Sequence, residues 1–363
     1  MSEEIFTVEQ EEAEGEPKLA LTVIVPARNE EVSLAACLDS LLAQSETGFE
    51  LGRDWELIVV DDHSTDGTGR IAAQCASQRA GVTLLEAPAL DQRNGGMTGK
   101  NNACWAGAQQ AQGKLLLFTD ADTIHEQGSL SRARREMEKY GAELLSYSPR
   151  QLTEGFWQRA LMPLIFSELA IAYPPKKVND PANRVAAANG QFLMVEQEDY
   201  FALGGHKAVG PMVLEDVALA NLFKRAKRTI RFRYAPDALS ARMYRSASEM
   251  IAGWTKNLAL LFPSILPLML MRLLDLLLFV GLPALALYPF FTTTQRLLIM
   301  ALWARVLWRL YTRVAKSNFS VADCAISVAG LPLLVFVLFR SYMQVKVRKS
   351  VEWKGRTYSN VSR

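Results

Sequence analysis

The fold is decided by the stretch WELIVVDDHSTDGT at residues 55–68, in which an apolar run ends in two aspartates and a polar turn. A continuous apolar, β-branched run of this length is typical of a strand that is buried on both faces of a parallel sheet. Two further runs have the same character, LALTVIVPA at residues 19–27 and KLLLFTD at residues 114–120. Each of them predicts another buried strand.

Helical patterns lie between these runs. Apolar residues recur at helical spacing in residues 30–44, and further helices are expected at residues 70–79 and 101–111, with one more strand at residues 82–86. Alternation of strand and helix predicts a parallel sheet with right-handed crossovers. We therefore expect a Rossmann-like α/β fold whose ligands gather at the carboxyl ends of the strands.

Composition excludes some classes of protein. The 363 residues carry 40 Lys+Arg against 38 Asp+Glu, a net charge of +2, and 50% are hydrophobic. This balance argues against a disordered chain, and it gives no electrostatic reason to expect a nucleic-acid partner. The cysteines are scattered without a CxxC pair, which fits a reducing compartment; they are Cys37, Cys75, Cys104 and Cys324.

The two halves of the chain differ. Residues 1–18 form an acidic segment that we expect to be disordered, and it lacks the basic and apolar runs of a signal peptide. Residues 19–257 mix charged and apolar residues as a soluble domain does, whereas residues 258–340 are mostly apolar and predict transmembrane or interfacial helices. Residues 341–363 form a basic tail, which is expected in the cytoplasm.

Aspartates follow two of the predicted strands. Asp62 lies at the end of the second strand, and Asp120 and Asp122 follow the fourth. Carboxylates at this edge of a parallel sheet face the ligand crevice, and two of them around one turn can reach the same divalent cation. The alternative is that they only form turns, for which aspartate is well suited.

The motifs that cradle phosphate with backbone amides are not found. The turn PARNEEVSLAAC has no glycine, so it offers no GxGxxG site, and a P-loop is also missing. A bound phosphate would need Mg²⁺ or Mn²⁺ together with side chains, which suits Asp120 and Asp122. Lys100 is a candidate contact for a diphosphate, and a plain solvated lysine is the alternative.

An ordered series of short motifs resembles a family 2 glycosyltransferase with the GT-A nucleotide-sugar fold. The series runs VIVPARNE, VVDDHSTDGT, TGKNNA, LLFTDADT, NGQF, GGH, LEDVALA and RMYRS followed by GWTKN, and the C-terminal tail contains WKGRTY. The likeness is greatest to membrane-bound enzymes that glycosylate lipids, in the hopanoid-associated, carotenoid-acid and ceramide glucosyltransferase-like group.

The resemblance implies roles for individual residues. Four residues would hold the uridine of the donor, namely Pro26, Arg28, Glu30 and Asp62. Asp120 and Asp122 resemble the pair that binds the metal, and Asp216 resembles the base that activates the acceptor. Glu215 and Asp216 precede a helical stretch, so either could instead be an acid at a helix N-terminus. The Gln-x-x-Arg-Trp motif of processive synthases is absent, and Arg242 and Arg245 form only part of it.

The membrane region has conflicting signals. Residues 155–175 predict an interfacial helix beside the active site, or an amphipathic core helix. Three apolar blocks follow, at residues 258–291, 297–311 and 321–339. A cytoplasmic catalytic domain and a cytoplasmic basic tail require an even number of crossings, so two or four spans are favoured over three. Because arginine is costly in hydrocarbon, Arg305 and Arg309 indicate that the middle block is the one that lies in the interface.

Together these features predict an inverting hexosyltransferase in a bacterial-type inner membrane, with its catalytic domain in the cytoplasm. Its donor would be a nucleotide sugar, most simply a UDP-sugar, and its acceptor a hydroxyl or carboxyl group of a membrane lipid or terpenoid. Two alternatives stay open. One is a polyisoprenyl-phosphate glycosyltransferase, and the other is a catalytically silent nucleotide-sugar-binding membrane protein.

Overall fold

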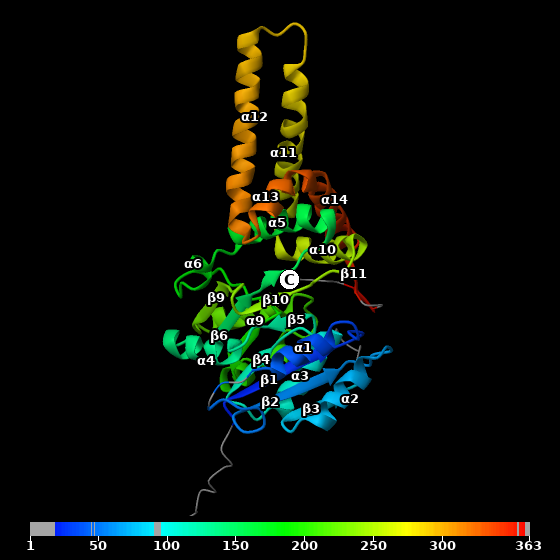
Figure 1. Ribbon diagram of the computed structural model, residues 1–363, viewed down its shortest axis with the longest axis vertical. Coiled ribbons are helices and arrows are strands. Elements are labelled where there is room, and N and C mark those ends of the chain that lie inside the picture. The colour runs from blue at the N-terminus through cyan, green and yellow to red at the C-terminus, as the bar shows by residue number, and fades with distance from the viewer. Residues whose placement is uncertain (1–18, 45, 47, 91–95, 354–355, 360–363) are drawn as a thin grey trace, which may run out of the picture.

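A computed structural model of the chain describes residues 19–44, 46, 48–90, 96–353 and 356–359. The acidic segment expected to be disordered, residues 1–18, lies outside the described residues. A mixed α/β domain carries a layer of helices at one end, and two long helices project from that layer (Figure 1).

The N-terminal half of the domain forms as the sequence predicts. Four parallel strands lie in the order β3-β2-β1-β4, and they are β1 (Leu21–Ala27), β2 (Trp55–Asp61), β3 (Val82–Glu86) and β4 (Leu115–Phe118). They are connected by α1 (Leu34–Leu42), α2 (Thr68–Gln78) and α3 (Gly99–Gln110). The Rossmann-like expectation is confirmed, and the carboxyl ends of β1, β2 and β4 share one edge.

The second half extends this sheet to seven strands. β8 (Leu193–Glu196) pairs antiparallel with both β4 and β6 (Leu144–Ser148), and β9 (Ile230–Tyr234) closes the edge parallel to β6. A small sheet joins the segment after β4 to the later chain, through β5 (Thr123–His125), β10 (Leu239–Ala241) and β7 (Arg150–Gln151). The helices of this half are α4 (Ser129–Tyr140), α6 (Pro175–Val178), α7 (Gln197–Ala202), α8 (Gly205–Ala208) and α9 (Glu215–Arg225).

A helical layer lies between this domain and the projecting helices (Figure 1). It consists of α5 (Gly155–Ala172), α10 (Ala247–Leu261), α13 (Val321–Ile326) and α14 (Leu331–Ser341). The expected boundary after residue 257 falls inside α10, because the amphipathic helix continues into the apolar segment. The helical chain also continues past residue 340, as a π-helical turn at Tyr342–Val347, before the hairpin of β11 (Ser350–Trp353) and β12 (Arg356–Ser359).

The projecting pair consists of α11 (Ile265–Ala286) and α12 (Thr293–Val314), which run antiparallel side by side (Figure 1). The Trp303 indole donates a hydrogen bond to the Phe279 carbonyl at 3.0 Å, and the two rings stack. Within the described residues, two stretches are long and apolar enough to cross a bilayer, Ile265–Ala286 and Val321–Val347, with mean hydropathies of 2.2 and 2.3.

Ion pairs connect this hairpin to the layer beneath it. Asp275 lies 2.7 Å from Arg272 on its own helix and 2.5 Å from Arg309 on α12. Glu168 of α5 lies 3.6 Å from Arg272 and 3.5 Å from Arg313. Arg309 is thus paired with a carboxylate, and α12 packs against α11. The prediction that the middle block lies in the interface is not tested by these contacts and stays a prediction.

Breaking this network should unfold the hairpin. Asp275 is 5% exposed, so Asp275→Asn leaves the buried Arg272 guanidinium without its nearer counter-charge and should cost about 3–5 kcal/mol of unfolding free energy. Asp237 also bridges two arginines, but its side chain is 52% exposed, and Asp237→Asn should cost at most about 1 kcal/mol. Thermal unfolding of both variants in one detergent tests this contrast, and equal shifts would contradict it.

Candidate active site

The candidate active site is a cavity of 520 Å³ between the carboxyl edge of the sheet and the helical layer. All eight residues named from the sequence line it, namely Pro26, Arg28, Glu30, Asp62, Lys100, Asp120, Asp122 and Asp216. The structure therefore brings together side chains that are up to 190 positions apart in the chain. Their individual roles stay predictions.

The end of β1 forms one wall of this cavity. Arg28 donates a hydrogen bond to the Asp62 carbonyl at 2.6 Å, and its guanidinium lies 3.8 Å from the Asp62 carboxylate. The Glu30 amide donates to the Thr68 hydroxyl at 2.7 Å, and the Glu30 carboxylate accepts a hydrogen bond from Ser33. These contacts hold the turn after β1 against the turn after β2.

The Lys100 ammonium lies between carboxylates of two segments that are distant in the chain. Its ammonium lies 2.7 Å from Asp120, after β4, and 2.7 Å from Glu215, at the start of α9. Burial opposes the charge of Lys100, but the two carboxylates outweigh it and hold the lysine pKa well above its usual range. The alternative of a solvated surface lysine is corrected, because Lys100 is only 36% exposed and is paired twice.

Asp216 occupies a different position from its neighbour Glu215. Its carboxylate accepts hydrogen bonds from the amides of Gly190, at 2.9 Å, and Val217, at 2.7 Å. Burial, together with repulsion from Glu215, raises the pKa of Asp216 to about 6. The pKa of Glu215 is lowered despite its burial, because Lys100 stabilises the charged form. Of the two acids, Asp216 is thus the one suited to taking up a proton near neutral pH.

Gly190, in the NGQF motif, is a functional position to which sequence analysis gave no role. A Cβ at this position would lie 2.9 Å from the Lys100 ammonium and 3.3 Å from a Glu215 oxygen. Only a residue without a side chain lets the backbone approach the charged groups this closely. In the sequence, the NGQF motif marks this position, but the motif alone gives no physical reason for its glycine.

The donor set of Asp120 and Asp122 fits a divalent cation. Both side chains line the cavity, and carboxylate oxygens are the ligands that Mg²⁺ and Mn²⁺ prefer. Among the described residues, no cluster of three or more His, Cys, Asp or Glu side chains could hold a metal ion. These two carboxylates would therefore need further oxygens from a bound diphosphate and water, which is how Mg²⁺ is usually held with phosphate substrates.

Apolar side chains line the side of the cavity that faces the helical layer. They are Phe166 and Leu169 from α5, Tyr173 directly after it, and Trp254 and Leu261 from α10, and the cavity is also lined by Arg242, Arg245 and Lys256. The Tyr173 hydroxyl donates a hydrogen bond to the Leu261 carbonyl, which ties the two helices together. The helix predicted at residues 155–175 therefore does lie beside the site.

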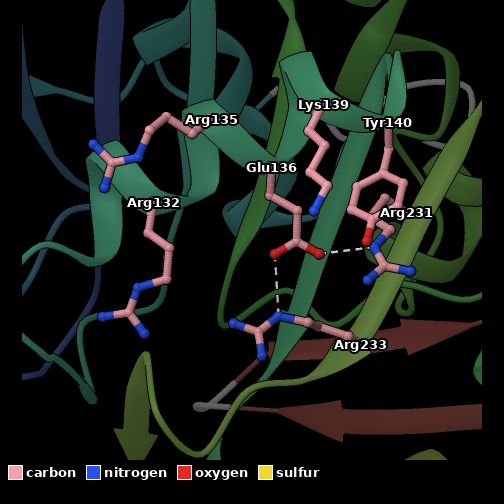
Figure 2. A pocket seen from close by; sticks show the side chains of 7 residues that line it. All are labelled: Arg132, Arg135, Glu136, Lys139, Tyr140, Arg231 and Arg233. Carbon is pink, nitrogen blue, oxygen red and sulfur yellow. Dashed lines mark hydrogen bonds and ion pairs between the residues drawn. The ribbon is translucent and has the colours of Figure 1, made fainter.

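A second cavity, of 360 Å³, lies at the outer edge of the sheet and is lined by residues of α4 and β9 (Figure 2). It is rich in arginine, but Glu136 pairs with Arg231 at 2.7 Å and with Arg233 at 3.2 Å. Asp237 pairs with Arg132 at 2.8 Å. These carboxylates already balance much of the positive charge, and none of the predicted site residues lines this cavity.

Comparison with known proteins supports the same assignment. Residues 22–194 match the family described as glycosyl transferase family 2. A 4,4'-diaponeurosporenoate glycosyltransferase of Staphylococcus haemolyticus is 28% identical over 359 residues, which cover 95% of this chain and 90% of that protein. The protein of the same description in Staphylococcus aureus (strain MRSA252) is 26% identical, over 94% of this chain and 88% of its own.

A solved structure shares the fold. The mannosyltransferase PcManGT from Pyrobaculum calidifontis, in complex with GDP-Man and Mn²⁺, has a TM-score of 0.50. The two sequences are 16% identical, and the alignment covers 92% of this chain and 89% of the other. At this identity, the likeness shows the GT-A fold alone.

The close packing at Gly190 predicts a selective loss of activity. Gly190→Ala should displace the flexible end of Lys100 and lower kcat/KM for nucleotide-sugar turnover by at least about tenfold, because such misplacement is costly in a pre-organised site. The thermal midpoint should change little. Gly281→Ala is the matched control, because a Cβ there meets nothing within 4 Å. Unchanged kinetics in Gly190→Ala would contradict the assignment.

Three findings agree on a glycosyltransferase: the matched family, the relatives along nearly the whole chain and the Rossmann-like sheet. Residues 22–194 therefore form a domain that matches glycosyl transferase family 2, and nearly the whole chain is similar to proteins described as glycosyltransferases.

Proposed function

We propose that this enzyme transfers a hexose from a UDP-sugar to the carboxyl or hydroxyl group of a lipid or terpenoid acceptor, with inversion at the anomeric carbon. The observation that carries this proposal is the composition of the cavity. One end has the carboxylates and Lys100, and the other end has the apolar side chains of α5 and α10. A polar donor and an apolar acceptor would therefore meet at Asp216. The relatives named for a carotenoid-acid substrate support this class of acceptor.

The donor would lie along the carboxyl edge of the sheet. Pro26, Arg28, Glu30 and Asp62 would surround the nucleoside, and Lys100 would face the diphosphate. Asp120 and Asp122 would hold Mg²⁺ or Mn²⁺ with the diphosphate oxygens, and the ion would supply positive charge for the leaving group. Which of the two metals serves in this enzyme is not fixed by the donor set, because both prefer oxygen ligands.

Asp216 would act on the acceptor. With a hydroxyl acceptor, the Asp216 carboxylate takes the proton while the acceptor oxygen attacks the anomeric carbon and the bond to the diphosphate breaks. A single displacement of this kind inverts the configuration. With a carboxyl acceptor the nucleophile is already an anion at neutral pH, so no proton has to be removed.

Two alternatives have to be separated from this proposal. A polyisoprenyl-phosphate acceptor would need a basic acceptor pocket, and Arg242, Arg245 and Lys256 line the cavity together with the apolar side chains. A catalytically silent binding protein would have no need of a buried carboxylate whose pKa is raised to about 6. Mass spectrometry of lipids from cells with and without the gene would separate these functions, since a missing glycolipid identifies both the sugar and the acceptor.

We also propose that the α11–α12 hairpin crosses the bilayer twice and that α13 and α14 lie at the cytoplasmic interface with α5. Each hairpin helix has 22 residues, or about 33 Å at 1.5 Å per residue, which matches a hydrocarbon core of about 30 Å. Of the paired charges near the base, Arg272 and Asp275 would then be shielded inside the hairpin and α5, at 2% and 5% exposed, whereas the Arg309 side chain is 60% exposed. This arrangement leaves the catalytic domain and the C-terminal tail on the cytoplasmic side of an inner membrane.

Asp216→Asn should distinguish the two acceptor classes. With an alcohol acceptor the substitution removes the proton acceptor, and kcat/KM should fall by about 10²–10⁴-fold. With a carboxylic acid the loss should stay within about tenfold. In the wild-type enzyme, transfer to the alcohol should decline as the pH falls below about 6, because Asp216 becomes protonated. Equal losses for both acceptors, or a normal rate with the alcohol, would contradict the role of a base.

Cysteine labelling tests the topology. In a background in which Cys75 and Cys324 are serine, an impermeant reagent should label Phe290→Cys in intact cells, because residue 290 lies at the hairpin tip and is 83% exposed. Ser359→Cys should react only after permeabilisation. Labelling of Ser359→Cys from outside would contradict an even number of crossings, and an unreactive Phe290→Cys would instead indicate a hairpin that re-enters.

A further inference from the structure

Exposed cations surround the helical layer. Lys176 and Lys177 lie on α6, which follows α5, and Lys316 lies in the turn Ala315–Ser317 between α12 and α13. Three more precede β11, and they are Lys346, Arg348 and Lys349. All six side chains are exposed, and none makes an ion pair or a hydrogen bond with the part of the chain that the structure describes. We call these six residues the basic rim.

The charge of the basic rim is not offset by acidic residues close to it in the chain. No Asp or Glu occurs in the segments that carry the rim, which are residues 174–179, 315–319 and 340–349. Carboxylates of the helical layer already have other partners. Asp323 pairs with Arg159 at 2.5 Å, and Glu168 lies 3.5 Å from Arg313. The rim therefore presents an excess of positive charge to its surroundings.

The position of the basic rim suits the headgroup region of a bilayer. In Figure 1, α6 and β11 lie beneath the helical layer, on opposite sides of the molecule, while the hairpin projects the other way. Apolar side chains are exposed in the same layer, among them Trp157 at the start of α5 and Phe339 on α14, each 50% exposed. Lysine and arginine beside exposed aromatic residues are typical of a surface that lies at a membrane interface.

Part of the basic rim also lies next to the candidate active site. Tyr173 lines the cavity, and Lys176 and Lys177 follow it by three and four residues. Their helix α6 contacts β9, whose residues Phe232 and Tyr234 line the same cavity. A headgroup bound by these two lysines would therefore lie beside the apolar part of the cavity.

We infer that the basic rim binds the anionic phospholipid headgroups of the leaflet on the catalytic side and so holds the cavity against that leaflet. This inference rests on the proposed function, in which the hairpin crosses the bilayer and the acceptor is a lipid or terpenoid. Each lysine or arginine near an anionic membrane surface adds to the attraction. Because the six side chains are exposed, salt should screen this attraction.

Electron spin resonance of spin-labelled lipids tests the inference without relying on sugar transfer. The full chain is reconstituted in phosphatidylcholine bilayers, and the protein-immobilised fractions of spin-labelled phosphatidylglycerol and spin-labelled phosphatidylcholine are compared. At low salt the wild type should prefer phosphatidylglycerol by at least about threefold. The preference should nearly vanish in about 1 M NaCl, where the Debye length is only about 3 Å.

Removing cations from the basic rim should weaken the preference. Lys176→Gln combined with Lys177→Gln should lower it by at least about twofold at low salt, because two charges near the headgroups are lost. Lys346→Gln combined with Arg348→Gln should have an effect of similar size at the other side of the layer. If either pair does not fold, as judged by its thermal midpoint, Lys316→Gln combined with Lys349→Gln replaces it.

A matched control removes two exposed cations far from the layer. Arg79 follows α2 and precedes β3, and Arg225 ends α9 ahead of β9, so both lie toward the amino edge of the sheet, opposite the helical layer. Arg79→Gln combined with Arg225→Gln should keep the wild-type preference. An equal loss in this control would show an effect of net charge alone and overturn the inference. A wild type without preference, or rim variants that keep it, would also overturn it.

Failure of the proposed function would look different. If the wild type preferred phosphatidylglycerol but Phe290→Cys stayed unreactive from outside, the two crossings would be wrong while the lipid-binding role of the basic rim stood. If Phe290→Cys was labelled and sugar was transferred but no lipid preference was found, the role of the basic rim would be wrong while the proposed function stood.

Discussion

The double ion pair of Lys100 is the constraint on which the active site depends. It holds Asp120, at the end of β4, and Glu215, at the start of α9, at 2.7 Å from one ammonium group. Asp216 follows Glu215 directly, so the same contact sets the distance between the carboxylates proposed to bind the metal and the proposed base. Gly190 permits the contact, since a side chain there would meet Lys100. The relative position of these two proposed parts of the site is thus set by one lysine.

This constraint explains which parts of the site could be predicted. Asp62, Asp120 and Asp122 follow buried strands, and strand ends meet at one edge of a parallel sheet, so their position was accessible from local pattern alone. Gly190 lies in the NGQF motif, but its close approach to Lys100 and Glu215 brings together segments that are distant in sequence. Periodicity describes one segment at a time and contains no information on such an approach. The later strands β6, β8 and β9 were missed for a related reason, because their pairing is not that of successive strand-helix units.

The helical region also shows that one segment of sequence does not reveal its partners, and here the consequence is energetic. The cost of an arginine in an apolar environment depends on its partner, and that partner lies on another helix. Arg309 is paired with Asp275, and Arg313 is near Glu168 of α5. From its own sequence, the middle block is too charged to accompany α11. In the structure, Arg309 and Arg313 lie near carboxylates at the base of the hairpin, where α5 contributes Glu168. Because α5 also lines the active-site cavity, the same helix connects the hairpin to the place where an acceptor would react.

The charge of the acceptor decides how much catalysis the protein must supply. A hydroxyl group needs a base, and the raised pKa of Asp216 suits that task only above about pH 6. A carboxylate needs no base but must enter a site that already carries negative charge, so it needs a cation at its own end of the cavity. An alcohol acceptor would therefore make transfer depend on the protonation state of Asp216, whereas an acid acceptor would not.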